Sequence, residues 1–209
     1  MEVVSKEEFL LNRERFVRIV KEGAIFIHPT DTIYGIGCIA TKNRVVEKVR
    51  RIKKRDIMPF SIIAPSMEWI RNNCIIPDFG EEWLNKLPGP YTLILRLKNK
   101  NAIAPEVNSG WDTVGVRIPK HWISDFVREL GVPIITTSAN ITGEEFMTSL
   151  ENLNPEIKNK MDFIIYEGEK RGFPSTIVNL SGEKVEIVSR AQKRELKPIS
   201  NLIGGLIRK

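Results

Sequence analysis

The chain has 209 residues, 42% of them hydrophobic and 28% charged, which is the composition of a globular protein long enough to bury a substantial core. Its 32 Lys and Arg residues against 26 Asp and Glu residues give a net charge of +6, which favours anionic partners such as nucleotides or RNA, although charge alone does not exclude a simple solvated surface. No apolar run reaches the roughly 18 residues of a membrane span, and residues 1–8 lack the plan of a signal peptide, so we expect a cytoplasmic protein without a membrane partner.

The first quarter of the chain predicts a helix, a strand, a polar loop and a second helix. Ser5 and Glu8 have the spacing of a capping box, and apolar residues then recur at helical spacing up to Gly23. Residues 24–27 predict a buried strand, and residues 29–37 follow it as a loop of hydroxyls, a carboxylate, a phenol and two glycines. Asn43 is expected to cap the second helix, which ends in the basic run 50–55.

The remaining chain alternates short strands with short helices. Helices are predicted over residues 67–72, 81–86 and 122–130, and strands over 60–64, 91–97, 113–118, 133–137, 162–166, 175–180 and 184–188. Interleaved strands and helices indicate an α/β fold, and the closely spaced last strands indicate a mixed rather than a purely parallel sheet.

The scarcity of cysteine and histidine limits the chemistry. Cys38 and Cys74 lie too far apart for a zinc motif and are interpreted as small buried hydrophobes. His28 and His121 are the only two histidines in the sequence, so few imidazoles are available for a Ser-His-Asp mechanism or a histidine-based metal site. No linker, repeat or low-complexity stretch divides the chain, and we expect a single domain over residues 1–209.

Small polar side chains or an arginine occur at four predicted strand ends. Each of them alone is better explained as a cap, a turn residue or the start of a strand. Together they predict a cleft for an anionic, hydrogen-bonding ligand, because an α/β sheet presents one ligand to several loops. These residues are Thr30 and Thr32, Arg117, Ser138 and Asn140, and Ser175.

Two nucleotide-binding patterns were tested against the sequence. Residues 35–40 satisfy the dinucleotide pattern G-x-G-x-x-A, but a polar segment separates them from the preceding strand, and Asp56 belongs to a basic helix end instead of a strand tip. We therefore expect no NAD(P) and no oxidoreductase activity. The chain also lacks G-x-x-x-x-G-K-[ST], so a nucleotide would bind without a classical phosphate loop.

Several motifs in order resemble the YrdC-like domain family, the L-threonylcarbamoyladenylate synthases. The resemblance covers nearly the whole chain and is far more specific than any one motif. The motifs are residues 29–37 (PTDTIYGIG), 53–55 (KKR), 87–92 (LPGPYT), 114–119 (VGVRIP), 137–140 (TSAN) and 174–178 (PSTIV).

The resemblance implies a fold, a reaction and partners. It implies a twisted mixed sheet with helices on its faces and a large basic cleft, and a nucleotidyltransferase that makes threonylcarbamoyl-AMP and pyrophosphate from L-threonine, bicarbonate and ATP with Mg²⁺. The product would serve the N6-threonylcarbamoyladenosine modification of tRNA position 37 through a downstream threonylcarbamoyl transferase complex. Binding of tRNA or double-stranded RNA is a further expectation, and no protein residue is expected to ligate a metal.

The resemblance also assigns roles to individual residues. Arg117 would fork onto the threonine carboxylate, and the carbamate formed from threonine would attack the α-phosphorus while cations neutralise the phosphates. The threonine-binding positions are Thr32, Arg117, Thr136 and Ser175, and the nucleotide-binding positions are Lys53, Arg55, Thr113, Ser138, Asn140 and Arg190.

The chain departs from the family pattern at four places that bear on activity. Asp56 replaces the proline of Lys-x-Arg-Pro, Met58 and Phe146 stand where polar nucleotide contacts are common, and Ile63 stands where many members have a histidine. The alternative hypothesis, which the net positive charge and the basic run 50–55 suggest, is an RNA-binding or ribosome-associated module that uses the same basic cleft without synthase activity.

Overall fold

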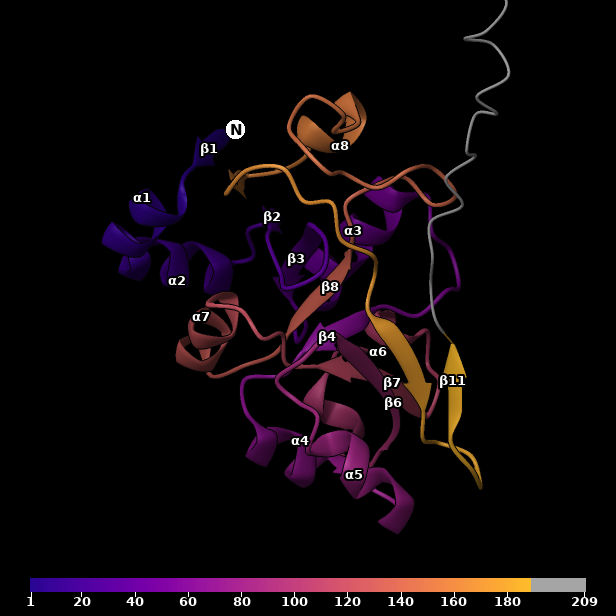
Figure 1. The fold of residues 1–209 in the computed structure, drawn as a ribbon. Coiled ribbons are helices and arrows are strands. Elements are labelled where there is room, and N and C mark those ends of the chain that lie inside the picture. The colour runs from indigo at the N-terminus through magenta and orange to yellow at the C-terminus, as the bar shows by residue number, and fades with distance from the viewer. Residues whose placement is uncertain (189–209) are drawn as a thin grey trace, which may run out of the picture.

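The computed structural model describes residues 1–188, and the predicted site residue Arg190 lies outside them. In this part of the chain, strands and helices alternate around one twisted mixed sheet (Figure 1). The strands are β1 (Glu2–Val4), β2 (Phe26–His28), β3 (Gly35–Ile39), β4 (Ser61–Ile63), β5 (Cys74–Ile75), β6 (Tyr91–Leu97), β7 (Thr113–Arg117), β8 (Ile134–Ser138), β9 (Phe163–Ile165), β10 (Thr176–Asn179) and β11 (Glu186–Val188). The helices are α1 (Lys6–Leu11), α2 (Arg13–Glu22), α3 (Asn43–Lys53), α4 (Met67–Asn73), α5 (Glu81–Leu84), α6 (Pro105–Asn108), α7 (Ile123–Leu130) and α8 (Pro155–Lys158).

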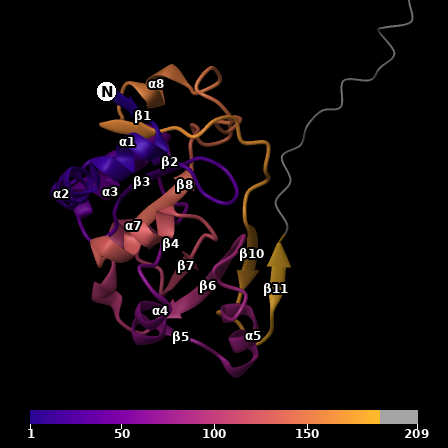
Figure 2. The same ribbon diagram turned by 60° about the vertical axis from the view of Figure 1, so that its left-hand side comes forward.

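The sheet order is β1-β9-β2-β3-β8-β4-β7-β6-β10-β11, with β5 paired to β6 beside this path. Parallel pairs such as β4 with β7 and antiparallel pairs such as β3 with β8 occur in the same sheet. Figure 2 shows β10 and β11 at one edge, on the far side of the sheet from α1 and α2. The predicted α/β class and mixed sheet are therefore confirmed.

Helices cover both faces of the sheet, and each face has its own apolar core. On one face Ile36, Ile62 and Ile135 pack with Val46 and Val49 of α3. On the other face α1, α2 and α7 cover a second core, which contains a cluster of stacked and edge-on phenylalanines, Phe9, Phe16, Phe26, Phe126 and Phe163. These three helices lie together on the left of Figure 1 and leave the remainder of that face to the site described below.

The structure corrects several sequence predictions. Ser5 and Glu8 do form the capping box, but the first predicted helix is two helices that meet at Asn12. Asn43 is the first residue of α3, and Lys42 is its N-cap. The largest miss is β3, part of which was assigned to the polar loop: its two glycines indicate a loop locally, yet it pairs with β2 on one side and β8 on the other. The short elements β1, β5, α6 and α8 were also missed.

No helix within residues 1–188 is both long and apolar enough to span a bilayer.

Candidate functional site

The register of the central strands collects polar side chains on one face of the sheet. Paired residues share a face, and Gly37, Thr136, Ser61 and Gly115 form one continuous row across β3, β8, β4 and β7. Two residues along the same pair of strands, Ser138 opposes Gly35, so Ser138 lies on the same face as Thr136. The residues between these positions are the apolar side chains of the α3 core, and the polar face therefore follows from simple alternation.

A pocket of about 130 Å³ opens on this face. Eight of its lining residues carry hydroxyl groups, and two carry guanidinium groups, Arg55 and Arg117. Phe146, Pro59 and Pro174 add apolar surface. Hydrogen-bonding groups with two cations and an apolar edge suit a small anionic ligand.

Glycines keep the floor of the pocket open. A Cβ added at Gly115 would lie 2.8 Å from Ser61 Oγ, and one at Gly35 would lie 3.0 Å from Thr136 Oγ1. Since real Cβ atoms do not approach neighbours this closely without displacement, side chains at these positions would shift the hydroxyls that line the pocket.

His28, the last residue of β2, packs against the glycines of β3. A Cβ at Gly37 would lie 2.9 Å from its ring, so the glycine makes room for the imidazole. Burial lowers the pKa of His28 to about 3, and Nδ1 hydrogen-bonds to the Pro29 carbonyl at 3.2 Å. This histidine is therefore neutral at physiological pH, and Nδ1 carries its proton.

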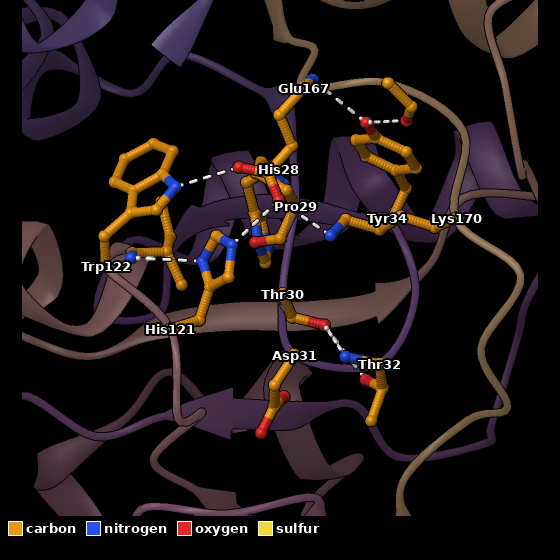
Figure 3. A network of polar contacts seen from close by, with 12 residues as sticks. His28, Pro29, Thr30, Asp31, Thr32, Tyr34, His121, Trp122, Glu167 and Lys170 are labelled. Carbon is orange, nitrogen blue, oxygen red and sulfur yellow. Dashed lines mark hydrogen bonds and ion pairs between the residues drawn. The ribbon is translucent and has the colours of Figure 1, made fainter. Parts of the chain in front are cut away.

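The β2–β3 loop forms a directed chain of hydrogen bonds that ends at Arg117. Thr30 Oγ1 donates to the Ile33 carbonyl at 2.8 Å, so its oxygen accepts from Thr32, whose Oγ1 lies 2.9 Å away. Arg117 Nη2 in turn donates to Thr32 Oγ1 at 3.2 Å and to Asp31 Oδ1 at 2.7 Å. Thr32 therefore offers a ligand only its acceptor lone pairs. Figure 3 shows Thr30, Asp31 and Thr32 below Pro29.

Asp31 and Arg117 form a buried ion pair. Their side chains are 10% and 6% exposed, and the other Asp31 carboxylate oxygen accepts the backbone N–H of Lys120 at 2.9 Å. The acid thus fixes the arginine at the end of β7 and ties it to the loop after that strand.

The segment from Tyr166 to Ser175 passes over this loop and delivers Ser175 to the pocket. A Cβ at Gly172 would lie 2.5 Å from the Thr32 carbonyl, so the two backbones are in direct contact. Ser175 Oγ lies 2.7 Å from Thr92 Oγ1 on β6. The segment therefore forms the wall of the pocket on the side of Thr32 and Thr92.

Glu167 fastens the start of this segment (Figure 3). Its carboxylate contacts His121 Nε2 at 2.8 Å and accepts from Trp122 Nε1 at 2.9 Å and Lys170 Nζ at 2.7 Å. Tyr34 adds two bonds, since its hydroxyl donates to the Gly168 carbonyl and accepts the Glu167 N–H. Burial opposes the charge of Glu167, but the hydrogen bonds of its neighbours outweigh burial and lower its pKa to about 2.

The turn after α3 forms another wall of the pocket, and hydrogen bonds from Arg50 fix its conformation. Lys54 adopts a left-handed conformation with φ 49°, which turns the chain so that Arg55 reaches the pocket. Arg50 donates to the carbonyls of Arg55, Asp56 and Met58 at 3.1–3.2 Å. Arg50 also donates to the Glu106 carbonyl and to the Ser109 hydroxyl, so its role is to stabilise this turn.

Lys53 lies behind the pocket and does not line it. Its ammonium donates to the carbonyls of Ser138 and Asn140, both at 2.6 Å, and to Asn140 Oδ1 at 3.1 Å. Ser138 Oγ donates to the same Asn140 Oδ1 at 2.6 Å. Lys53 and Asn140 therefore shape the loop that presents Ser138.

The structure brings most of the predicted site residues together. Arg117, Thr136, Ser175, Arg55 and Ser138 line the pocket, and Thr32 touches it through Arg117. Lys53 and Asn140 stand behind the Ser138 wall, and Thr113 lies at the start of β7, where its carbonyl accepts from Asn108. Whether these residues bind threonine or nucleotide stays a prediction.

Sequence reasoning missed Ser61 and Thr92, which also line the pocket. Ser61 is the first residue of β4 and Thr92 the second of β6, and a lone hydroxyl at the start of an apolar run was the available signal. The expected large basic cleft stays a prediction as well, because the enclosed volume is small and its cations are two arginines. Among residues 1–188, no group of His, Cys, Asp and Glu side chains has the arrangement of a metal site.

Comparison with known proteins identifies the family of the chain. Residues 18–191 match the sequence model named Sua5_yciO_yrdC, which is described as "Telomere recombination". A protein of Methanocaldococcus jannaschii, whose name assigns it provisionally as a threonylcarbamoyl-AMP synthase, is 38% identical over 170 residues, which cover 79% of either chain.

Two further matches involve Pyrococcus abyssi. Its threonylcarbamoyl-AMP synthase is 34% identical over 191 residues, and the match covers 88% of this chain but only 55% of that protein. The crystal structure of P. abyssi Sua5 complexed with L-threonine superposes with a TM-score of 0.79 at 29% identity, covering 89% of this chain and 56% of the other. The chain thus spans about half the length of this relative.

Proposed function

The chain belongs to the Sua5/YciO/YrdC family, and on that premise we propose that it is a threonylcarbamoyl-AMP synthase. The reaction would join L-threonine and bicarbonate to the AMP part of ATP and release pyrophosphate. The observation that carries the proposal is that Arg117, Thr136 and Ser175 line the same pocket as Arg55 and Ser138. A site for an amino-acid carboxylate and a site for a phosphate are thereby adjacent, as an adenylate-forming reaction requires.

The threonine end of the pocket would be the wall of Arg117, Thr136 and Ser175. Arg117 would bind the carboxylate, and the hydroxyls of Thr136 and Ser175 would orient the side chain and the amine of the substrate. Thr32 would accept a hydrogen bond from the amine or the hydroxyl, because its own proton is already donated to Thr30. A relative solved with L-threonine supports this choice of ligand.

The chemistry would proceed in two steps, with the substrates held in place. The amine nitrogen of threonine would bond to the carbon of bicarbonate, with loss of water, to give a carbamate. A carbamate oxygen would then form a bond to the α-phosphorus of ATP while the bond to the pyrophosphate oxygen breaks. Because no imidazole lines the pocket, the protein would act by positioning and electrostatics, as in other phosphoryl and nucleotidyl transfers.

The nucleotide would occupy the side of Arg55 and Ser138 and extend out of the pocket. The enclosed 130 Å³ is below the roughly 300–1,000 Å³ of sites that surround drug-sized ligands, so part of the ATP would remain exposed. Mg²⁺ would arrive on the phosphates of ATP, where it supplies charge neutralisation, because Asp31, the carboxylate that contacts Arg117, is already bonded to that arginine and to a backbone N–H.

The product would be passed in the cytoplasm to a threonylcarbamoyl transferase complex that modifies tRNA position 37. The defining experiment is mass spectrometry of the product formed from ATP, Mg²⁺, L-threonine and bicarbonate, with pyrophosphate measured in parallel. We expect threonylcarbamoyl-AMP, and pyrophosphate release that requires threonine and bicarbonate together. Pyrophosphate release that ignores threonine, or none at all, would exclude the synthase.

A further inference from the structure

Lys53 is a buried cation held in an unusual way. Its side chain belongs to α3, the residue is 1% exposed, and its three acceptors are two backbone carbonyls and one amide oxygen. An ammonium has three protons to donate and a neutral amine has two, so loss of the proton would give up one of these three hydrogen bonds.

None of these acceptors carries a negative charge, and Lys53 forms no ion pair within residues 1–188. Two carboxylates on the surrounding elements are engaged elsewhere, since Glu144 accepts from the Asn154 amide and Glu156 pairs with Lys54. The other titratable groups on the elements around Lys53 are Cys38 on β3, Tyr34 before β3, Glu106 on α6, Glu145 and Glu151 in the 141–154 loop, Lys158 on α8, Arg44, Glu47, Lys48, Arg50 and Arg51 on its own helix, and Arg55 just after that helix. An isolated charge in the interior is costly unless another charge balances it.

The balancing charge can come from the pocket. Ser138, whose carbonyl and hydroxyl belong to the Lys53 network, lines the pocket, and so does Arg55, two residues along the chain. Lys53 and Arg55 repel each other, and an anion bound beside Arg55 and Ser138 would offset both charges.

We propose that Lys53 is a positioning residue that holds the 138–140 loop, and that its charge is completed by the phosphates of the bound nucleotide, so that nucleotide binding takes up a proton at Lys53. The inference rests on the proposed function for the identity of the anion. It assigns Lys53 a role different from direct contact with the nucleotide.

The electrostatics agree with this coupling. Burial lowers the pKa of Lys53 to about 7, and the nearby Arg55 adds to the shift. A bound anion raises that pKa again, and by reciprocity a charged Lys53 raises the affinity for the anion by the same factor. Between about pH 7.5 and 9 the phosphates of ATP are already fully ionised, so a change of affinity in that range reports on the protein.

The test is isothermal titration of the full chain with MgATP in two buffers of different ionisation enthalpy. With a free pKa of about 7, the wild type should take up about three-quarters of a proton per nucleotide at a pH of about 7.5. Its affinity should fall about twentyfold between that pH and about 9. Lys54→Met is the matched control, because this neighbouring side chain is 62% exposed, pairs with Glu156 and does not line the pocket, and it should behave as the wild type.

Two variants of the network decide the outcome. Lys53→Met should bind without proton uptake and with an affinity that is flat over this range. If Lys53→Met does not fold, Asn140→Asp places a permanent negative charge at the amide oxygen 3.1 Å from the ammonium, and it should also abolish the uptake. Nucleotide binding by the wild type without proton uptake, or uptake that survives in both variants, overturns the inference alone. A wild type that binds no nucleotide overturns the proposed function with it.

Discussion

The buried pair of Asp31 and Arg117 supports a quantitative prediction. Arg117→Met removes the cation and leaves the Asp31 carboxylate, 10% exposed, with its hydrogen bond from the Lys120 N–H. Breaking a buried ion pair by removing one partner costs about 3–5 kcal/mol. In a chain of this size 1 kcal/mol corresponds to about 2–4 °C, so the melting temperature should fall by about 6–20 °C.

The second variant of this pair separates stability from substrate binding. Asp31→Asn combined with Arg117→Met removes both charges and should recover more than half of the lost stability, because no uncompensated carboxylate remains. Both the single and the double variant should lose threonine-dependent pyrophosphate release, since neither offers a guanidinium to the amino-acid carboxylate.

Calorimetric melting and urea titration measure the first effect, and pyrophosphate release over a range of threonine concentrations measures the second. A single variant as stable as the wild type would refute the energetic role of the pair. A folded double variant that keeps the wild-type KM for threonine would refute the assignment of Arg117 to the substrate carboxylate.

Three further predictions test other parts of the site. Arg50→Lys keeps the charge but loses the forked bonds to the 55–58 turn, so urea titration should show a loss of about 1–3 kcal/mol, and the KM for ATP should rise as Arg55 loses its position. Gly115→Ala places a Cβ 2.8 Å from Ser61 Oγ and should lower the free energy of unfolding by about 1–3 kcal/mol. Pyrophosphate release should fall even at temperatures at which the variant is fully folded. The pKa of Glu167 is lowered from 4.5 to about 2, so the stability that its carboxylate contributes is complete above pH 4.5 and is lost as the pH falls towards 2. Glu167→Gln should therefore flatten the acid limb of a curve of unfolding free energy against pH.

Local sequence signals determined the element types and many of the residues that line the pocket. The apolar periods located α3, α7, β6 and most other strands, and the Ser5 capping box marked the start of α1. Polar residues at strand ends indicated Arg117, Ser138 and Ser175, all of which line the pocket. These predictions succeeded because alternation, helical spacing and capping depend on residues a few positions apart.

The tertiary structure decided which strands are neighbours and which cations reach the pocket. A strand with two glycines, β3, is recognisable only once β2 and β8 pair with it, and the row from Gly37 to Gly115 exists only through that register. Lys53 and Arg55 stand two residues apart in one basic run, yet the left-handed turn at Lys54 buries the first behind the 138–140 loop and brings the second to the pocket wall. Burial and electrostatic balance depend on partners more than 80 positions away, and no local pattern encodes them.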